Sequence, residues 1–284
     1  MKDLCIVNGA AGFPLRLTCI PDPPERLWIR GAACHLPGMD EPSIAVVGSR
    51  AATRDGLESA RRLADGLARA GVAVVSGLAR GIDATAHVAA LEANGRSIAV
   101  LGSGLGHIYP PEHRPLVERL LACGAVVSEY PPDTPPHRAL FPRRNRLVSG
   151  LADAVVVVEA PEKSGALITA GLALDQGKDV MVVPGRVAGG RNRGGHLLIR
   201  DGAKLVETAD DILLEMGWVA VGLQPGIRLD GSPELTEFTV DDVVRTTGEQ
   251  PQTVLARLLQ QELAGEIRRI GSARFLRVRT RVLT

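Results

Sequence analysis

The chain has 284 residues, which is long enough for one large domain or two ordinary ones. Hydrophobic residues make up 45% and charged residues 23% of it, a balance that is typical of a folded globular protein and excludes a disordered chain. The formal net charge is only +1, so a site for a polyanion has to come from local clustering of basic residues.

Cysteine usage and apolar runs predict the compartment. The four cysteines lie far apart and form no C-x-x-C pair, which argues against a zinc site or a disulfide framework and favours a reducing cytosol. The longest apolar runs, such as Ala154 to Val158, are far too short to span a membrane. We therefore expect a cytoplasmic protein with no metal and no membrane partner.

The first 42 residues carry one clear strand signal. The stretch from Arg26 to Arg30 alternates between polar and apolar residues, as an exposed edge strand would. We expect residues 1–42 to extend a neighbouring sheet rather than to fold alone.

From residue 43 onward, short β-branched runs alternate with helix-patterned segments such as Leu57 to Leu67. The runs are continuously apolar, which indicates strands that are buried on both faces of a parallel sheet. Repeated strand–helix–strand units predict a doubly wound, mostly parallel α/β domain over residues 43–218. The strand runs are residues 44–47, 72–75, 98–101, 125–127, 154–158 and 180–183.

A linker rich in glycine and proline, residues 219–233, precedes a compact module over residues 234–284. In this module a helix is predicted from Thr239 through Arg245, Pro251 opens a longer helix, and residues 267–278 have the pattern of a β-hairpin. Two helices and a hairpin predict a small C-terminal winged-helix domain. Its eight arginines are nearly balanced by seven acidic residues, so DNA contact and protein contact both stay open as its role.

Four strand exits of the α/β domain carry residues that suit an anionic ligand. Glycines let a phosphate approach the backbone, while serine and arginine side chains add donors and positive charge. A tight turn explains each glycine equally well when a loop is taken singly, but four such loops together favour a polyanion site. The exits are Gly48-Ser49-Arg50, Ser76 to Asp83 with Arg80, Gly102 to Gly106 with Ser103, and Phe141 to Gly150.

The fourth exit has the most specific composition, because it places one aromatic ring among arginines with no acidic residue between Asp133 and Asp153. Arginine forks match phosphate geometry, and the ring of Phe141 offers a face on which a base can stack. The combination points to single-stranded nucleic acid. A solvated basic loop with Phe141 packed into the core is an equal alternative on the pattern alone. The polar residues beside the ring are Arg143, Arg144, Asn145 and Arg146.

A second basic stretch, rich in glycine, follows the last predicted strand. A loop that an anion orders and a solvated surface loop are equal alternatives for it. Its basic residues are Arg186, Arg191, Arg193, Arg200 and Lys204.

The sequence gives little indication of a catalytic site. It has no G-x-x-x-x-G-K-[ST] motif, no metal-ligand spacing of histidines and no recognisable nucleophile–base arrangement. Asp83 and His87 share a helix face, which a helix cap beside a packed histidine explains. We interpret Glu159 as an anchor for the loop from Lys163 to Ala166. We expect a binding protein without a cofactor rather than an enzyme.

These motifs resemble the bacterial DNA-processing protein family DprA, also called Smf. Order and spacing agree over residues 21–216, and the C-terminal module is similar to the winged-helix domain that many members carry. Many members begin with a helical SAM-like domain, whereas this chain starts close to where that domain would end. The resembling segments are Val47–Arg50, Ser76–Asp83, Leu101–Leu105 with Tyr109-Pro110, Ser128–Pro131, Phe141–Gly150, Ser164–Ala170, Val183–Gly185 and Leu198–Ala203.

The resemblance implies an extended Rossmann-like fold that binds single-stranded DNA and forms a homodimer. It also implies a recombination mediator that loads the recombinase RecA onto incoming DNA, past single-strand-binding protein, during natural transformation. Phosphates would lie on Arg50 and Arg143, and a base beside Phe141. The DNA-binding residues expected in all are Ser49, Arg50, Ser76, Arg80, Gly102, Ser103, Phe141, Arg143, Arg144, Asn145, Arg146 and Lys163.

Two other functions stay open. Nucleotide phosphoribohydrolases of the cytokinin-activating type share a related fold, but their signature P-G-G-x-G-T-x-x-E is absent, and the corresponding region is Ala160–Ala166. A winged-helix regulator with an α/β sensor domain would prefer a specific duplex. Turnover of nucleoside monophosphates and competition between single-stranded and duplex DNA separate the three functions.

Overall fold

The computed structural model describes residues 3–31, 36–39, 41–220, 237–239, 243, 251–263, 267–269, 274–277 and 281–283. Contacts divide the chain into two units, Met1–Ile212 and Leu213–Thr284. The predicted linker, residues 219–233, lies for the most part outside the described residues, and the predicted domain bounds stay a prediction. No helix among the described residues is long and apolar enough to cross a membrane.

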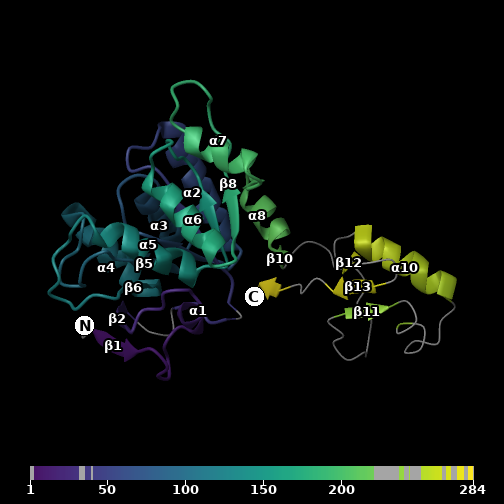
Figure 1. Cartoon of the computed structure of the whole chain (residues 1–284), viewed down its shortest axis with the longest axis horizontal. Helices are drawn as coiled ribbons and strands as arrows, with labels where there is room; N and C mark the ends of the chain where they lie inside the picture. Colours follow the sequence, from purple (N-terminus) through teal and green to yellow (C-terminus); the bar gives the residue numbers. More distant parts are fainter. Residues whose placement is uncertain are drawn as a thin grey trace. The chain divides into compact units, whose positions relative to one another are not determined.

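The first unit is built on a nine-stranded sheet with the strand order β1-β2-β6-β5-β4-β3-β7-β8-β9 (Figure 1). Strands β3 to β9 run parallel, which confirms the predicted Rossmann-like, doubly wound α/β fold. The strands are β1 (Leu4–Val7), β2 (Arg26–Gly31), β3 (Ser43–Val47), β4 (Ala73–Ser76), β5 (Ser97–Val100), β6 (Ala125–Ser128), β7 (Ala154–Val157), β8 (Asp179–Val182) and β9 (Lys204–Leu205).

Every residue of the five inner strands β3 to β7 is buried, which is why their sequences are apolar except for one serine at an end of β3, β4, β5 and β6. Successive side chains point to opposite faces, so each strand feeds two hydrophobic cores. Val127 belongs to the core beneath α5 and α6, while its neighbour Val126 belongs to the core beneath α4.

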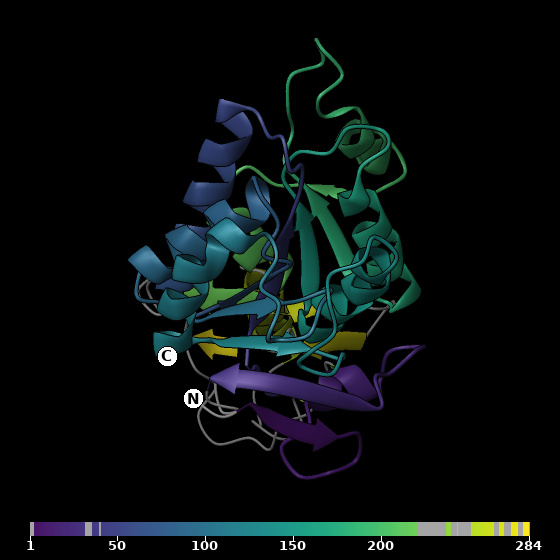
Figure 2. The same cartoon turned by 90° about the vertical axis from the view of Figure 1, so that its left-hand side faces the viewer.

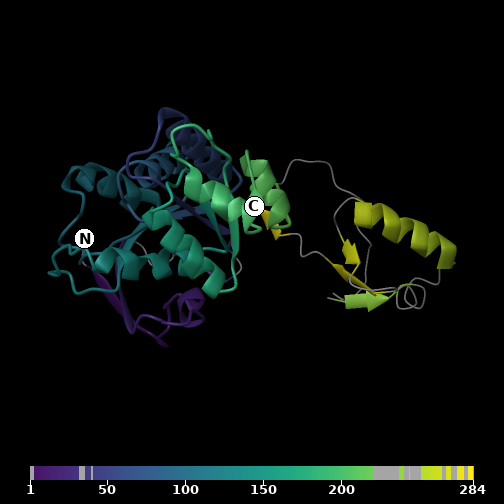
Figure 3. The ribbon, with the colours of Figure 1, turned by 45° about the horizontal axis from the view of Figure 1, so that its top comes forward.

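Helices cover both faces of the sheet, with α2, α3 and α4 on one side and α5, α6 and α7 on the other (Figures 2 and 3). Helix α2 begins where the hydroxyl of Thr53 accepts a hydrogen bond from the Gly56 amide, and a buried stripe that includes Leu63 and Leu67 packs inward. The helices are α1 (Leu15–Thr18), α2 (Arg54–Arg69), α3 (Ile82–Glu92), α4 (Arg114–Cys123), α5 (Leu140–Leu151), α6 (Gly165–Asp175), α7 (Arg193–Arg200) and α8 (Ala209–Glu215), with a 3-10 turn, η2, at Pro111–His113.

Strand β3 marks the switch point of the sheet. Strands β4, β5 and β6 follow one another on one side of it, whereas β7, β8 and β9 follow one another on the other side. The loops after β3 and β7 therefore leave in opposite directions and open a crevice at the carboxyl ends of the strands. Ligands of doubly wound folds bind at this place.

The segment before residue 43 contributes two antiparallel strands beyond β6. Strand β2 lies between β1 and β6, so the expectation that residues 26–30 form an exposed edge was wrong. Leu27 and Ile29 are fully buried, while Trp28 on the other face packs against the core beneath α4. The alternation in sequence comes from two differently covered faces rather than from an open edge.

The second unit contains two small sheets and one described long helix. Helix α10 (Pro251–Leu263) begins at the predicted proline, and it buries Val254 and Leu258 against Ile267. Most of the helix predicted from Thr239 through Arg245 lies outside the described residues, and Thr239 itself ends a strand. The winged-helix assignment stays a prediction. The strands are β10 (Trp218–Ala220) paired with β14 (Arg281–Leu283), and β11 (Glu237–Thr239), β13 (Arg274–Arg277) and β12 (Ile267–Arg269) in that order.

Candidate nucleic-acid interface

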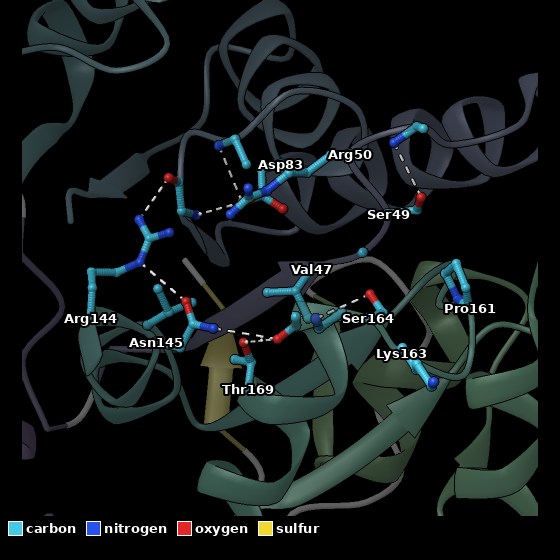
Figure 4. A pocket seen from close by; sticks show the side chains of 17 residues that line it. Val47, Ser49, Arg50, Asp83, Arg144, Asn145, Pro161, Lys163, Ser164 and Thr169 are labelled. Carbon is cyan, nitrogen blue, oxygen red and sulfur yellow. Dashed lines mark hydrogen bonds between the residues drawn. The ribbon is translucent and has the colours of Figure 1, made fainter. Parts of the chain in front are cut away.

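A cavity of about 450 Å³ opens at the switch point, between the loops that follow β3, β4 and β7 (Figure 4). Its walls come from four separate parts of the chain, which brings together three of the four predicted strand exits. We call this cavity the switch-point pocket. It is lined by Val47–Ala51, Gly77, Ala79, Asp83, Arg144, Asn145, Val148, Pro161, Lys163–Ala166 and Thr169.

The loop after β3 is held rigidly against its neighbours. A Cβ atom at Gly48 would lie 2.5 Å from the side chain of Ile82 and 3.0 Å from the carbonyl oxygen of Glu159, so only glycine fits there. The Ser49 amide donates to the Glu159 carbonyl at 2.7 Å, which links the exits of β3 and β7. The buried Ser49 hydroxyl accepts from the Ala51 amide at 3.2 Å. These contacts fix the backbone from which Arg50 projects to solvent.

Arg50 lies against a pair of aromatic rings, Tyr109 and Phe141, which we call the aromatic platform. The two ring centroids are 5.5 Å apart with planes inclined by 40°. The Arg50 guanidinium carbon lies 5.5 Å from the centroid of Phe141, within the range of a cation–π contact. A small cavity of about 40 Å³ adjoins the platform and is lined by Arg50, Gly77, Ala79, Arg80, Tyr109, Pro110, Phe141 and Arg144.

Phe141 does not pack into the hydrophobic core, which was the alternative left open by the sequence. The ring is only partly buried and belongs to neither hydrophobic core of the first unit. A Cβ atom at Gly102 would lie 2.7 Å from Phe141 Cδ1, so this glycine makes room for the ring. Tyr109, which is 42% exposed, was not predicted as a site residue. Its only signal was its position after the glycine-rich third exit.

Arg144 does not point to solvent as a phosphate ligand would. Its side chain is buried, and Nη1 donates to the carbonyl oxygens of Gly77, at 2.7 Å, and of Val100. Burial lowers the pKa of Arg144 to about 10, and the charge of nearby Asp83 opposes that shift. Arg144 is therefore a buried, charged strut within the pocket wall, and its prediction as a solvent-exposed DNA ligand is corrected.

Asp83 is the acidic partner of this strut rather than a helix cap. Its carboxylate accepts hydrogen bonds from the amides of Gly77, at 3.2 Å, and Ala79, at 3.3 Å, in the loop that precedes α3. Burial raises the pKa of Asp83, while the Arg144 charge lowers it. Asp83 and Arg144 thus each hold the loop after β4 through its backbone, and this loop lines both the switch-point pocket and the small cavity beside the aromatic platform.

Arg146 is also directed into the protein and not into the pocket. It forms ion pairs with Glu129 at 2.7 Å and with Asp22 at 2.8 Å. These contacts tie α5 to the end of β6 and to the N-terminal segment. Its predicted role in the DNA groove is therefore corrected to a structural one.

The serines of the second and third exits are likewise used inside the fold. The Ser76 hydroxyl is fully buried and donates to the Val46 carbonyl oxygen at 2.6 Å. The Ser103 hydroxyl is 1% exposed and donates to the His107 carbonyl oxygen at 2.6 Å. Because both donors are already engaged, neither serine is positioned to bind a phosphate.

Of the other predicted residues, Lys163 and Asn145 line the switch-point pocket, whereas Arg143 and Arg80 lie outside its lining. Lys163 is exposed on the rim, and Asn145 donates from Nδ2 to the Gly165 carbonyl oxygen at 3.4 Å. The Ser164 hydroxyl caps α6, whose first turn has no acidic residue, so the positive end of this helix lies in the pocket lining.

Arg143 is exposed on the first turn of α5. Arg80 is exposed beside the platform and pairs with Glu112 at 2.6 Å.

Two further titratable groups turn out to be structural. His87 is fully buried with Nδ1 2.7 Å from Ser97 Oγ, and burial lowers its pKa to about 3, so it is neutral at physiological pH. The Glu159 carboxylate accepts from the amide of Thr53 at 3.1 Å and thereby fixes the start of α2, not the Lys163 loop. Among the described residues, no three histidine, cysteine or acidic side chains gather as metal ligands.

Comparison with known proteins places this site in context. The family described as DNA recombination-mediator protein A matches residues 4–217. Protein Smf of Escherichia coli is 42% identical over 273 residues, which are 90% of this chain and 72% of that protein. The X-ray structure of DNA processing protein A (DprA) from Streptococcus pneumoniae has a TM-score of 0.70 and 39% identity, covering 76% of this chain and 75% of that one. A DNA processing protein A structure from Helicobacter pylori, concerned with its single-stranded DNA binding mode, has a TM-score of 0.67 and 28% identity, covering 76% and 96%.

Proposed function

The chain belongs to the DNA recombination-mediator protein A family, and from this premise we propose that it binds single-stranded DNA at the aromatic platform and the switch-point pocket. The observation that carries the proposal is the arrangement of Arg50 over the ring of Phe141 beside Tyr109. It presents a stacking surface and a phosphate-binding cation side by side.

The division of labour follows from the chemistry of the two groups. An unpaired base stacks on the aromatic platform, which is sequence-tolerant because every base has a flat π face. Phosphates bind Arg50, Arg143 and Lys163, and the positive end of the α6 dipole adds to the attraction. Asn145 and Ser49 line the same pocket and supply neutral contacts.

Single-stranded DNA is preferred to duplex DNA because of access to the base faces. In a duplex the faces are stacked on neighbouring pairs, and freeing one costs a few kcal/mol. A protein that gains its affinity from stacking on Phe141 and Tyr109 therefore favours strands whose bases are already exposed.

At the level of the pathway, we propose a recombination mediator that delivers its bound strand to the recombinase RecA, past single-strand-binding protein, during natural transformation in the cytoplasm. Family membership supports this role. We further propose a homodimer, because α6 and the edge strand β9 leave apolar side chains in solvent. These are Ile168 at 46%, Leu174 at 58% and Leu205 at 51% exposure.

Binding rather than catalysis is the better account of the pocket. Its one lining carboxylate, Asp83, is buried and accepts two backbone hydrogen bonds, so it is committed to holding a loop. Arg144 beside it is committed to backbone carbonyl oxygens. The phosphoribohydrolase alternative requires turnover of a nucleoside monophosphate, which we expect to be absent.

Competition between single-stranded and duplex DNA of the same sequence tests the proposal. Fluorescence anisotropy over a salt series is expected to give at least about tenfold tighter binding of the single strand, with affinity falling as salt rises. Preference for one specific duplex would favour the winged-helix regulator instead. Hydrolysis of nucleoside monophosphates by the same preparation would favour the enzyme.

A further inference from the structure

The fold divides the second basic stretch into two parts. Lys204 forms an ion pair with Asp179 at 3.9 Å, near the amino ends of β8 and β9. Arg200 is the last residue of α7. Arg186 and Arg191 instead lie in the loop from residue 183 to residue 192, which we call the β8–α7 loop. It projects beyond the carboxyl edge of the sheet (Figure 1).

The base of the β8–α7 loop is firmly fixed. Asn192 is 2% exposed, and its Oδ1 accepts from the Ala160 amide at 2.9 Å while its Nδ2 donates to the Val183 carbonyl oxygen at 2.9 Å. The Gly194 amide donates to the Ala160 carbonyl oxygen at 2.8 Å. One buried side chain therefore clamps the loop to the exits of β7 and β8, beside the switch-point pocket.

The tip of the same loop has open surroundings. Val187 is 82% exposed, and a Cβ atom added at Gly189 or Gly190 would meet nothing within 4 Å. From this tip the two arginines reach over the start of α2. Arg191 Nη1 donates to the Ala51 carbonyl oxygen at 3.4 Å, and Arg186 Nε lies 3.0 Å from the Asp55 carboxylate.

These contacts line up three arginines in space. Arg50 stands over Phe141, Arg191 touches the residue that follows Arg50, and Arg186 touches the first turn of α2. The Arg186 side chain is 84% exposed and that of Asp55 is 66% exposed, so their pair is solvated and contributes little to stability. A phosphate can take the place of Asp55 beside Arg186 without the loss of a buried contact.

We propose that the β8–α7 loop is a second contact for single-stranded DNA. A strand that leaves the aromatic platform passes over the amino end of α2, where Arg191 and Arg186 bind successive phosphates. A small anion would need only one of these arginines, whereas a line of cations that starts at the platform matches a polyanionic chain. This inference rests on the proposed binding of single-stranded DNA at the platform.

The test uses the full chain and two lengths of oligodeoxythymidylate, about 5 and about 20 nucleotides, of which the short one occupies the platform and pocket alone. The double variant Arg186→Ala/Arg191→Ala is compared with Arg62→Ala/Arg200→Ala, which removes the same charge from exposed sites on α2 and α7. We expect the loop variant to bind the long strand about tenfold more weakly and with a salt slope lower by about 1.4, because each lost phosphate contact lowers the slope by about 0.7.

Affinity for the short strand is expected to stay within about twofold of the unaltered protein, and the control variant is expected to keep its affinity for both lengths. Equal weakening of both lengths would overturn the proposal, because the loop would then act on the pocket itself. Unchanged binding of the long strand would overturn it as well. If the unaltered protein binds neither length, the proposed function fails together with this inference, a result that differs from both others.

Discussion

At the exposed start of α5, Phe141 stacks beside Tyr109 and Arg143 points to solvent. One and three residues later on the same helix, Arg144 is 4% exposed and Arg146 is 6% exposed, and both are held by internal partners. Successive residues of a helix are separated by about 100° around its axis, so adjacent arginines face different surroundings. The basic residues that are adjacent in sequence therefore form two groups in space. Arg143 is exposed to a ligand, whereas Arg144 and Arg146 stabilise the fold.

The largest effect is expected when an arginine of the buried group is removed, and it falls on the free energy of unfolding. Arg146→Ala leaves Glu129, whose side chain is 8% exposed, without its cation. Breaking one side of a buried ion pair costs about 3–5 kcal/mol of the free energy of unfolding. Urea denaturation measures it, and the matched control Arg143→Ala is expected to stay within about 0.5 kcal/mol of the parent. Similar losses for the two variants would contradict the division of α5 into two groups.

The buried side also predicts a dependence on pH. His87 packs behind the pocket near Arg144, and burial lowers its pKa to about 3 from 6.5. In the unfolded chain this histidine binds a proton as the pH falls below about 6.5, whereas in the folded chain it stays neutral down to about pH 3. The folded state is therefore fully stable above pH 6.5 and loses stability as the pH falls towards 3. The loss amounts to about 1.4 kcal/mol for each pH unit below the ordinary histidine value. His87→Gln, followed by urea denaturation at pH values from 7 down to about 4.5, is expected to show a smaller loss. Identical slopes for variant and parent would show that His87 does not carry the effect.

The exposed side is expected to change binding instead. Phe141→Ala removes the stacking surface and should weaken binding of single-stranded DNA by about 1–3 kcal/mol. Anisotropy titration measures the loss, and Phe141→Trp serves as a control that keeps a stacking ring. If the folded Phe141→Ala protein binds single-stranded DNA with the affinity of the parent, the ring of Phe141 has only a structural role.

A smaller effect is expected from the phosphate-binding arginines. Arg50→Ala and Arg143→Ala should each weaken binding irrespective of base sequence and lower the slope of log affinity against log salt by about 0.7. Arg62→Ala, an exposed arginine on the outer face of α2, is the charge-matched control. A slope that is unchanged in both variants would remove the two arginines from the DNA path.

Sequence alone predicted the fold well because its strands are buried on both faces. Continuous apolar runs such as residues 44–47 and 154–158 have no other stable place than the middle of a parallel sheet. Strand β1 escaped prediction because it is short and mostly exposed: of its four residues only Ile6 is buried. The position of β2 was misjudged for a different reason, since an alternating pattern reports how the two faces of a strand are covered and not where the strand lies in the sheet.

The candidate site was predictable in its composition but not in its geometry. Glycines at strand exits and an aromatic residue among arginines predicted a site at the carboxyl edge of the sheet, and cavities lined by Ser49, Arg50 and Phe141 lie there; that DNA binds in them stays a prediction. Ser76 and Ser103 were misassigned because their hydroxyls already donate to carbonyl oxygens, of Val46 on the neighbouring strand β3 and of His107 in the same loop as Ser103. The apolar pattern of the sequence does not report such hydrogen bonds.

The central claim is that a base of single-stranded DNA stacks on Phe141 and Tyr109 while its phosphate lies on Arg50. Photocrosslinking with an oligodeoxythymidylate that carries one 5-iodouracil, followed by mass spectrometric mapping, tests it most directly, because this base couples to the aromatic side chain on which it stacks. The account predicts crosslinks on Phe141 and Tyr109, and their loss when excess unlabelled single strand is added. Crosslinks confined to the second unit, with none on either ring, would contradict it.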